Sequence, residues 1–183
     1  VAIDEIQKLA DACKAVGGLL VVDEAYAEFS QEKSAVTLID EFENIIVIRT
    51  MSKAFAFAGV RLGYLVAKPE VIEAILLVRL PYHLSTLTQC AAEVALENSE
   101  QLLDQVSELV YSRDKLILEL VSMGLKVMPT EANFILFSGF KGSSSQIWQA
   151  LVEHGVLVRD VGLPGYLRVT VGTEAENRKF VTE

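Results

Sequence analysis

The sequence has few cysteines and no segment typical of a membrane span. Its two cysteines, Cys13 and Cys90, lie far apart without a C-x-x-C pair. We therefore expect neither a metal site nor a disulfide framework, and interpret both thiols as core residues. No stretch approaches the roughly 18 uninterrupted apolar residues that cross a bilayer. Even the richest run, residues 71–80, contains Glu73 and Arg79, and it predicts a buried or half-buried helix.

Basic residues are also in the minority. Lys and Arg number 16 against 25 Asp and Glu, and the net charge is −9. This balance argues against a nucleic-acid partner, which requires a basic surface. It suits a soluble cytoplasmic protein that meets small molecules. The chain starts at Val1 without an initiator Met, a basic segment or a signal-peptide core, so we expect it to begin inside a longer protein.

The first part of the chain alternates helices with short apolar strands. Apolar residues recur at helical spacing over residues 2–16. Continuous apolar runs at residues 19–22 and 45–48 are typical of strands buried on both faces, and residues 63–67 are a third strand candidate. Pro69 fits the first turn of a helix that runs to about residue 77. This alternation indicates a parallel α/β layer.

The second part of the chain has a different pattern. Residues 86–122 are mostly helical, and the pattern predicts two helices that meet near Asn98. The elements expected after Gly124 are strands at residues 127, 134–137, 156–158 and 167–171, a helix at 144–153 and a further helix from Glu174. Together they predict a smaller α+β unit.

Lys53 lies in a loop just after the apolar run 45–48, among apolar neighbours and without an adjacent acid. A partly desolvated amine loses its proton more readily and is a better nucleophile. On these facts alone a surface-loop lysine is the favoured interpretation. The neighbours change this, because Thr50 and Ser52 offer hydroxyls and Arg61 offers a guanidinium, a set that binds a phosphate dianion. A lysine that forms an imine beside phosphate-binding groups indicates pyridoxal phosphate.

Asp23 lies at the carboxyl end of the apolar run 19–22, where α/β sheets bind ligands. Opposite a pyridine nitrogen, its carboxylate would keep that nitrogen protonated. Tyr26 could direct its hydroxyl to the phenolic oxygen of the ring. The pattern D-x-x-Y has little specificity by itself, and an aspartate that caps a helix after the strand is the alternative.

Two strings extend this set of residues. They are VDEAY at residues 22–26 and SKAF-x-x-AG-x-R-x-GY at residues 52–64. Together they resemble the core of the fold-type I, class II aminotransferases. LPYHLS at residues 80–85 and GYLRVTVGT at residues 165–173 are most similar to the histidinol-phosphate aminotransferase subfamily, and the similarity covers essentially the whole chain.

The resemblance implies a role for each matching residue. Lys53 would be the Schiff-base lysine and proton shuttle. Asp23 would pair with the pyridine nitrogen of pyridoxal phosphate, and Tyr26 with its phenolic oxygen. The residues that would hold the cofactor phosphate are Thr50, Ser52 and Arg61.

Two arginines match the substrate-binding positions of the subfamily. The resemblance implies that Arg168 binds the anionic end of the substrate and that Arg159 is a second substrate-side arginine. Each begins or ends an apolar strand pattern, where a charge is costly unless it meets an anion. The alternative is a pair of surface arginines that bridge to Asp160 or Glu174.

The resemblance also implies a fold and a reaction. Residues 1–100 would be the C-terminal part of a mainly parallel-sheet, cofactor-binding α/β large domain, and residues 101–183 a small C-terminal α+β domain. Because family members are about twice as long, the chain would be their C-terminal half. The implied enzyme is a homodimer that interconverts L-histidinol phosphate and 2-oxoglutarate with imidazole acetol phosphate and L-glutamate in histidine biosynthesis.

Other functions remain open from the sequence. The same scaffold supports an aromatic amino-acid aminotransferase or a phosphothreonine decarboxylase, and the chain could be a catalytically incompetent fragment. A Ser-Lys hydrolase that uses Ser52 and Lys53 is disfavoured, because adjacent residues in such a loop rarely face each other and no oxyanion-hole motif accompanies them.

Overall fold

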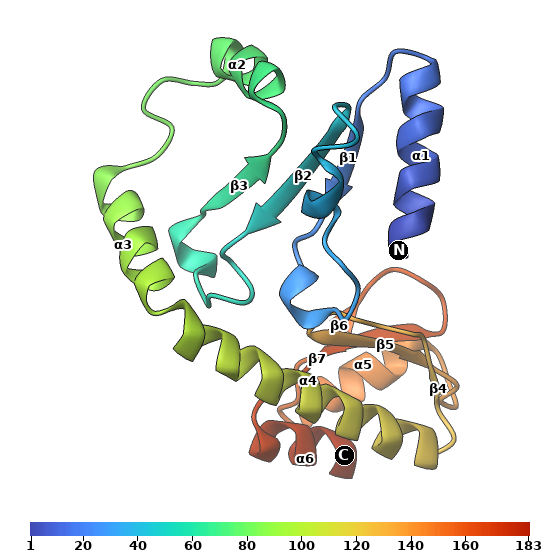
Figure 1. The fold of residues 1–183 in the computed structure, drawn as a ribbon. Coiled ribbons are helices and arrows are strands. Elements are labelled where there is room, and N and C mark those ends of the chain that lie inside the picture. The colour runs from blue at the N-terminus through green and yellow to red at the C-terminus, as the bar shows by residue number, and fades with distance from the viewer. The chain divides into compact units, whose positions relative to one another are not determined.

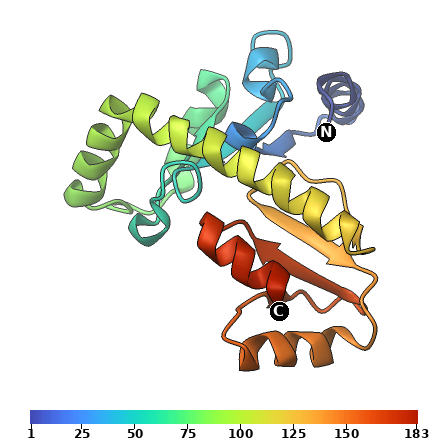
Figure 2. The same ribbon diagram turned by 90° about the horizontal axis from the view of Figure 1, so that it is seen from below.

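The computed structural model describes residues 1–183 and divides into two units, Val1–Leu103 and Asp104–Glu183. Figures 1 and 2 show the elements of both units from two directions. Helix α4 (Ser99–Ser122) contains the division. No helix in the structure combines the length and the apolar character needed to cross a lipid bilayer.

The first unit is built around a three-stranded sheet in the order β1-β2-β3. Strands β1 (Leu20–Asp23) and β2 (Ile45–Thr50) are parallel, as expected. Strand β3 (Gly63–Val66) is antiparallel to β2, so this strand departs from the parallel layer that the alternation indicated, within a sheet that was expected to be mainly rather than wholly parallel. The reason is the connection: between β2 and β3 it contains only the short 3-10 helix η3 (Ala58–Val60), whereas a parallel pair requires a longer crossover.

Helix α1 (Ile3–Ala15) ends as the glycines predict and packs its buried Ile6 and Ala10 into the core of the first unit. The other core residues are Ala35, Leu38, Ile39, Phe42, Ile45 and Val47. The 3-10 helices of this unit before β2 are η1 (Ala27–Phe29) and η2 (Ala35–Leu38).

Strand β1 is not buried on both faces, contrary to the sequence prediction. Leu20 and Val22 pack against the core, but Val21 is 55% exposed. Successive side chains of a strand point to opposite faces, and residues 1–183 cover only one face of this strand. The apolar run therefore identified the strand but not its burial.

The helices after β3 are more exposed than expected. Helix α2 (Pro69–Val78) has no buried residue, and Leu77 is 87% exposed, so a fully buried helix is wrong, whereas Val71, Ile72 and Ile75 are half-buried as the other alternative predicted. Helix α3 (Thr86–Glu97) precedes α4 directly, which confirms two helices meeting near Asn98. Cys90 is exposed, so it is not a core thiol, whereas Cys13 is partly buried.

The second unit has a four-stranded antiparallel sheet in the order β4-β5-β7-β6. Its strands are β4 (Lys126–Val127), β5 (Phe134–Ser138), β6 (Arg159–Asp160) and β7 (Tyr166–Thr170). Helices α5 (Ser144–Glu153) and α6 (Glu174–Thr182) complete the unit and confirm the two helices predicted there.

Residues 156–158 do not form the predicted strand, because strand β6 starts one residue later, at Arg159. Val156 and Val158 are nevertheless buried in the core with Leu116, Ile135 and Leu167. The Nε1–H of Trp148, in helix α5, donates to the Val158 carbonyl over 2.9 Å, so this carbonyl is bonded to a side chain rather than to a neighbouring strand. The apolar residues Val156 and Val158 therefore indicated burial rather than strand pairing.

Candidate active site

The parallel pairing of β1 and β2 brings their carboxyl ends to one edge of the first sheet. Asp23, the last residue of β1, is paired with Ile48, and its side chain is exposed. Its Oδ1 accepts a hydrogen bond of 3.0 Å from the Ala25 N–H, in a turn that precedes η1. Asp23 therefore orders the turn that carries Tyr26 and still presents its carboxylate to solvent.

Lys53 follows β2 at the same edge. Its neighbours Met51, Ala54 and Phe55 are buried, whereas Lys53 is exposed. The expected partial desolvation of the amine is therefore not found within residues 1–183. The Lys53 Nζ lies 5.8 Å from the centroid of the Tyr26 ring. The structure thus brings together the lysine and the tyrosine that the sequence assigned to one site.

The loop after β2 is ordered by the Thr50 hydroxyl. Thr50 Oγ1 donates to the Leu62 carbonyl over 3.2 Å and accepts from the Ser52 N–H over 3.1 Å. Its only proton is therefore used inside the loop, and Thr50 can offer none to a phosphate in this conformation. The Ser52 hydroxyl makes no hydrogen bond in the structure, which leaves it as the donor of the predicted pair.

Arg61 has a left-handed backbone, with φ 58° and ψ 46°. This conformation costs a non-glycine residue about 1–2 kcal/mol, and such strain is concentrated at functional sites. The side chain is exposed, and its guanidinium donates to the Ala58 carbonyl over 2.9 Å. Thr50 pairs with Gly63, which places Arg61 close to the end of β2.

An ion-pair network that the sequence analysis missed lies beside these residues. Arg49 binds Glu24 over 2.7 Å and Glu28 over 3.0 Å, and the three side chains are at most 18% exposed. Burial opposes the charge of Arg49, but the hydrogen bond to Glu24 and the charges of Glu24 and Glu28 outweigh it, so the pKa of Arg49 is raised. An arginine directly after the apolar run 45–48, together with two acids four residues apart, was the available signal.

In the second unit, Arg159 of β6 lies directly opposite Arg168 of β7. The Arg168 guanidinium stacks at 4.7 Å from the Phe134 ring centroid, and its Nε is buried without a hydrogen-bond partner. The alternative bridges are not formed. Asp160 accepts from the Gly162 N–H, and Glu174 binds Arg178 over 2.8 Å.

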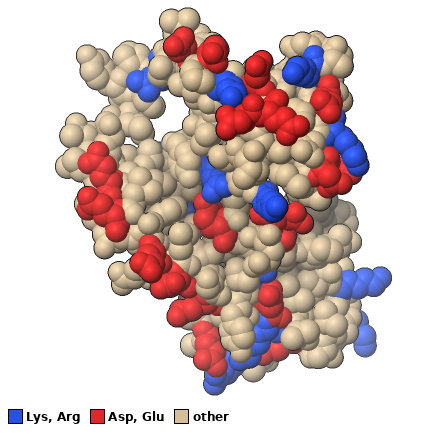
Figure 3. All heavy atoms as spheres, in the orientation of Figure 1, with Lys and Arg blue, Asp and Glu red and all other residues tan.

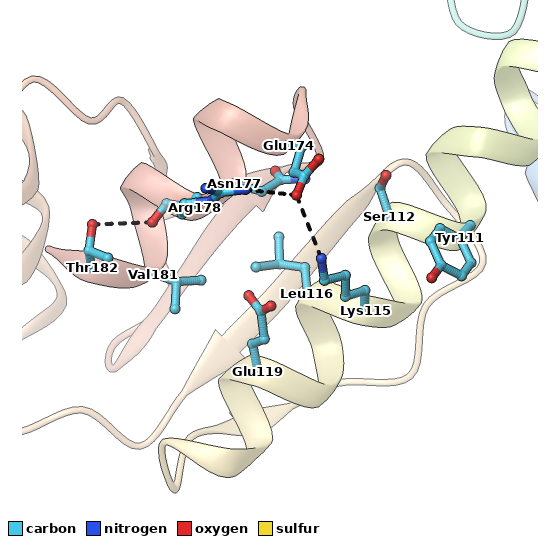
Figure 4. A pocket seen from close by; sticks show the side chains of 10 residues that line it. All are labelled: Tyr111, Ser112, Lys115, Leu116, Glu119, Glu174, Asn177, Arg178, Val181 and Thr182. Carbon is cyan, nitrogen blue, oxygen red and sulfur yellow. Dashed lines mark hydrogen bonds and ion pairs between the residues drawn. The ribbon is translucent and has the colours of Figure 1, made fainter.

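A cavity of about 440 Å³ also lies in the second unit, between α4 and α6 (Figure 4). Glu174, which lines the cavity, lies 2.8 Å from Arg178 and 4.0 Å from Lys115, so these three charged residues of the cavity wall pair with one another. None of the predicted site residues lines it. On the face drawn in Figure 3, basic and acidic side chains are interspersed rather than gathered into a basic patch.

The family model described as Aminotransferase class I and II matches residues 1–183. The chain belongs to this family. It is 52% identical over 182 residues to the histidinol-phosphate aminotransferase of Mycolicibacterium smegmatis, covering 99% of this chain and 47% of the relative. It is 55% identical over 174 residues to the histidinol-phosphate aminotransferase of Nocardia farcinica, covering 94% and 45%.

The fold of this class I and II aminotransferase chain also matches solved structures. The histidinol-phosphate aminotransferase of Sinorhizobium meliloti, in complex with pyridoxal-5'-phosphate, superposes with a TM-score of 0.81 at 25% identity, covering 96% of this chain and 50% of that one. The family resemblance and the fold class drawn from the sequence are thereby confirmed. The chain spans about half the length of the curated relatives that it matches.

Proposed function

We propose that this chain is the cofactor-binding and substrate-binding part of a histidinol-phosphate aminotransferase. The enzyme would transfer an amino group between L-histidinol phosphate and 2-oxoglutarate, giving imidazole acetol phosphate and L-glutamate. The observation that carries the proposal is the approach of the Lys53 amine to the Tyr26 ring, 5.8 Å from its centroid, at the sheet edge that also ends in Asp23. Curated relatives at 52% and 55% identity support this substrate over others.

The donor set of the first unit fits pyridoxal phosphate group by group. Lys53 supplies an amine for the aldehyde, and the exposed Asp23 carboxylate suits a protonated pyridine nitrogen. Tyr26 supplies a hydroxyl for the phenolic oxygen. The phosphate would be held by Ser52 and Arg61, with Thr50 fixing the loop between them.

When bound, pyridoxal phosphate supplies an electron sink that makes the Cα proton of the substrate acidic. Lys53 would take that proton and return it, as a general base and then a general acid. The Asp23 carboxylate would hold the proton on the ring nitrogen throughout. Tyr26 would donate its hydroxyl hydrogen bond and keep the ring in register with the Lys53 amine.

Arg159 and Arg168 would bind the anionic end of the substrate. A phosphate or carboxylate would neutralise two cations that are directly opposed in the strand ladder and would give the buried Arg168 Nε an acceptor. Planar guanidinium groups suit this two-point recognition better than ammonium groups.

A second candidate is a catalytically incompetent fragment; the chain covers 47% and 45% of these two relatives. Titration of the 183-residue chain with pyridoxal phosphate separates cofactor binding from turnover.

Homodimeric assembly and a cytoplasmic location stay predictions, and light scattering on the full-length protein checks the assembly.

Turnover is measured on a full-length protein, meaning a polypeptide that contains this chain and has the length of its relatives. We expect kcat/KM for L-histidinol phosphate to exceed that for phenylalanine by at least about 100-fold, because the phosphate brings up to two negative charges to Arg159 and Arg168, whereas the phenylalanine carboxylate brings one. A preference for phenylalanine would instead support the aromatic aminotransferase.

A further inference from the structure

The guanidinium of Arg49 binds both ends of the turn that carries Asp23 and Tyr26, the two residues proposed to contact the cofactor ring. Glu24 immediately follows Asp23, and Glu28 lies two positions beyond Tyr26. Arg49 binds Glu24 through Nε over 3.0 Å and through a terminal nitrogen over 2.7 Å. Its other terminal nitrogen binds Glu28 over 3.0 Å. We call Arg49, Glu24 and Glu28 the carboxylate clamp.

The clamp joins this turn to the loop that carries Lys53. Arg49 lies in strand β2 and is followed at once by Thr50, whose hydroxyl orders the start of that loop. Because the guanidinium extends from β2 and both carboxylates come from the turn after β1, the clamp sets the distance between the two segments. Two donors of the η2 start also bind Glu24, Ser34 Oγ over 2.8 Å and the Ala35 N–H over 2.6 Å.

The clamp places three charged side chains in largely buried positions, where the loss of their hydration costs free energy. The side chains of Glu24, Glu28 and Arg49 are 10%, 11% and 18% exposed. One cation faces two anions, and Glu28 Oε2 is buried without a hydrogen-bond partner. Buried ion pairs commonly stabilise a fold no better than apolar residues of the same volume, so stability alone does not account for the clamp and a role in fixing geometry is the alternative.

We propose that the carboxylate clamp positions Asp23 and Tyr26 against Lys53, so that Arg49, Glu24 and Glu28 are positioning residues for the cofactor. None of the three needs to touch the cofactor itself. The assignment rests on the proposed function, because it presumes that pyridoxal phosphate binds at Lys53. The assignment depends on one observation, that the Arg49 guanidinium binds a carboxylate at each end of the turn.

The test compares Arg49→Met, Arg49→Lys and Glu28→Gln in the full-length protein. Pyridoxal phosphate is titrated to obtain its Kd, and the visible band of the lysine-bound cofactor is followed against pH. We expect Arg49→Met to raise Kd by roughly 10- to 100-fold, because displacement of aligned groups by about 1 Å costs rates and affinities of this order. The pH midpoint should move upward, since the phenolic oxygen loses a well-aligned donor.

Arg49→Lys keeps the charge but cannot hold two carboxylates in a planar fork, so its Kd and midpoint should lie between those of the wild type and Arg49→Met. Glu28→Gln should shift both quantities in the same direction by less. If Arg49→Met fails to fold, the Kd and the pH midpoint of Arg49→Lys and Glu28→Gln test the positioning role instead.

The matched control is Asn44→Ala. Asn44 is 8% exposed and donates to the Ala10 carbonyl over 2.8 Å and to the Gly18 carbonyl over 3.3 Å, in the same unit but away from the turn. It should lower Tm and leave Kd and the pH midpoint unchanged. Clamp variants that lower Tm but match Asn44→Ala in Kd and midpoint would overturn the positioning role alone. Absence of the visible band in the wild type would overturn the proposed function, and the clamp assignment with it.

Discussion

Arg159 and Arg168 are directly opposite each other in the β6–β7 ladder. Like charges at opposed positions destabilise a strand pair. Arg168 is further constrained, because its guanidinium stacks 4.7 Å from the Phe134 ring centroid while its Nε is buried without a partner. An anion bound by both arginines would offset this repulsion and give the Arg168 Nε an acceptor.

The first prediction concerns Arg168→Lys. We expect kcat/KM for a phosphate-bearing substrate to fall by roughly 30- to 700-fold, since losing one partner of a buried charged hydrogen bond costs about 2–4 kcal/mol. Steady-state kinetics on the full-length protein measure this. Arg178→Gln, which changes an exposed arginine paired with Glu174, is the control and should stay near wild type. Equal kinetics for Arg168→Lys and wild type would contradict the substrate role.

The second prediction separates the strain at Arg61 from its charge. Arg61→Gly should unfold with a free energy about 1 kcal/mol higher than Arg61→Ala, because only glycine adopts a left-handed backbone without a Cβ penalty. Both variants should bind pyridoxal phosphate roughly 10- to 100-fold more weakly, through the loss of a charged hydrogen bond. Denaturant unfolding and cofactor titration measure the two effects. Unchanged affinity in both variants would remove Arg61 from the phosphate site.

The third prediction concerns the backbone approach at Gly63. A Cβ added to Gly63 would lie 2.9 Å from the Arg49 carbonyl oxygen, so β3 and β2 would have to separate. We expect Gly63→Ala to lower the free energy of unfolding by about 1–3 kcal/mol. Gly59→Ala is the control for stability, because a Cβ there meets nothing within 4 Å. Equal thermal unfolding of the two variants would mean that the strands tolerate the methyl group.

The fourth prediction is a pH dependence at the start of α6. The backbone N–H and then the hydroxyl of Thr173 lower the pKa of Glu176 from its usual value of 4.5. A folded-state pKa below the unfolded one stabilises the protein above about pH 4.5, and this contribution is lost as the pH falls through the folded value. Glu176→Gln should therefore weaken the dependence of Tm on pH between pH 3 and pH 5, whereas Glu119→Gln should leave that dependence unchanged. The same slope in all three proteins would contradict this.

Strand and helix positions followed from the sequence wherever the pattern was local. The helix at residues 144–153 and the apolar run at 45–48 were predicted because periodicity and caps lie within the segment. Burial was predicted less well. The exposure of Val21 and Leu77 depends on what packs against each face, and a single strand or helix does not encode that.

The same distinction holds for the site. Lys53 and Tyr26 were identified from motif spacing, and the structure places them near each other. The part played by Arg49 was not identified, because its partners Glu24 and Glu28 are 25 and 21 positions away and meet it only through parallel strand pairing. The exposure of Lys53 was also missed, since buried neighbours in the sequence do not bury a side chain that points away from them.

The central claim is that Lys53 carries the cofactor, and its most direct test is the site of covalent attachment. The chain is incubated with pyridoxal phosphate, reduced with borohydride, digested and analysed by mass spectrometry, with Lys53→Ala and Lys33→Ala as the paired variants. The account predicts one dominant pyridoxyl adduct on Lys53, which is lost in Lys53→Ala and kept in Lys33→Ala. Labelling spread over several surface lysines, and unchanged in Lys53→Ala, would contradict it.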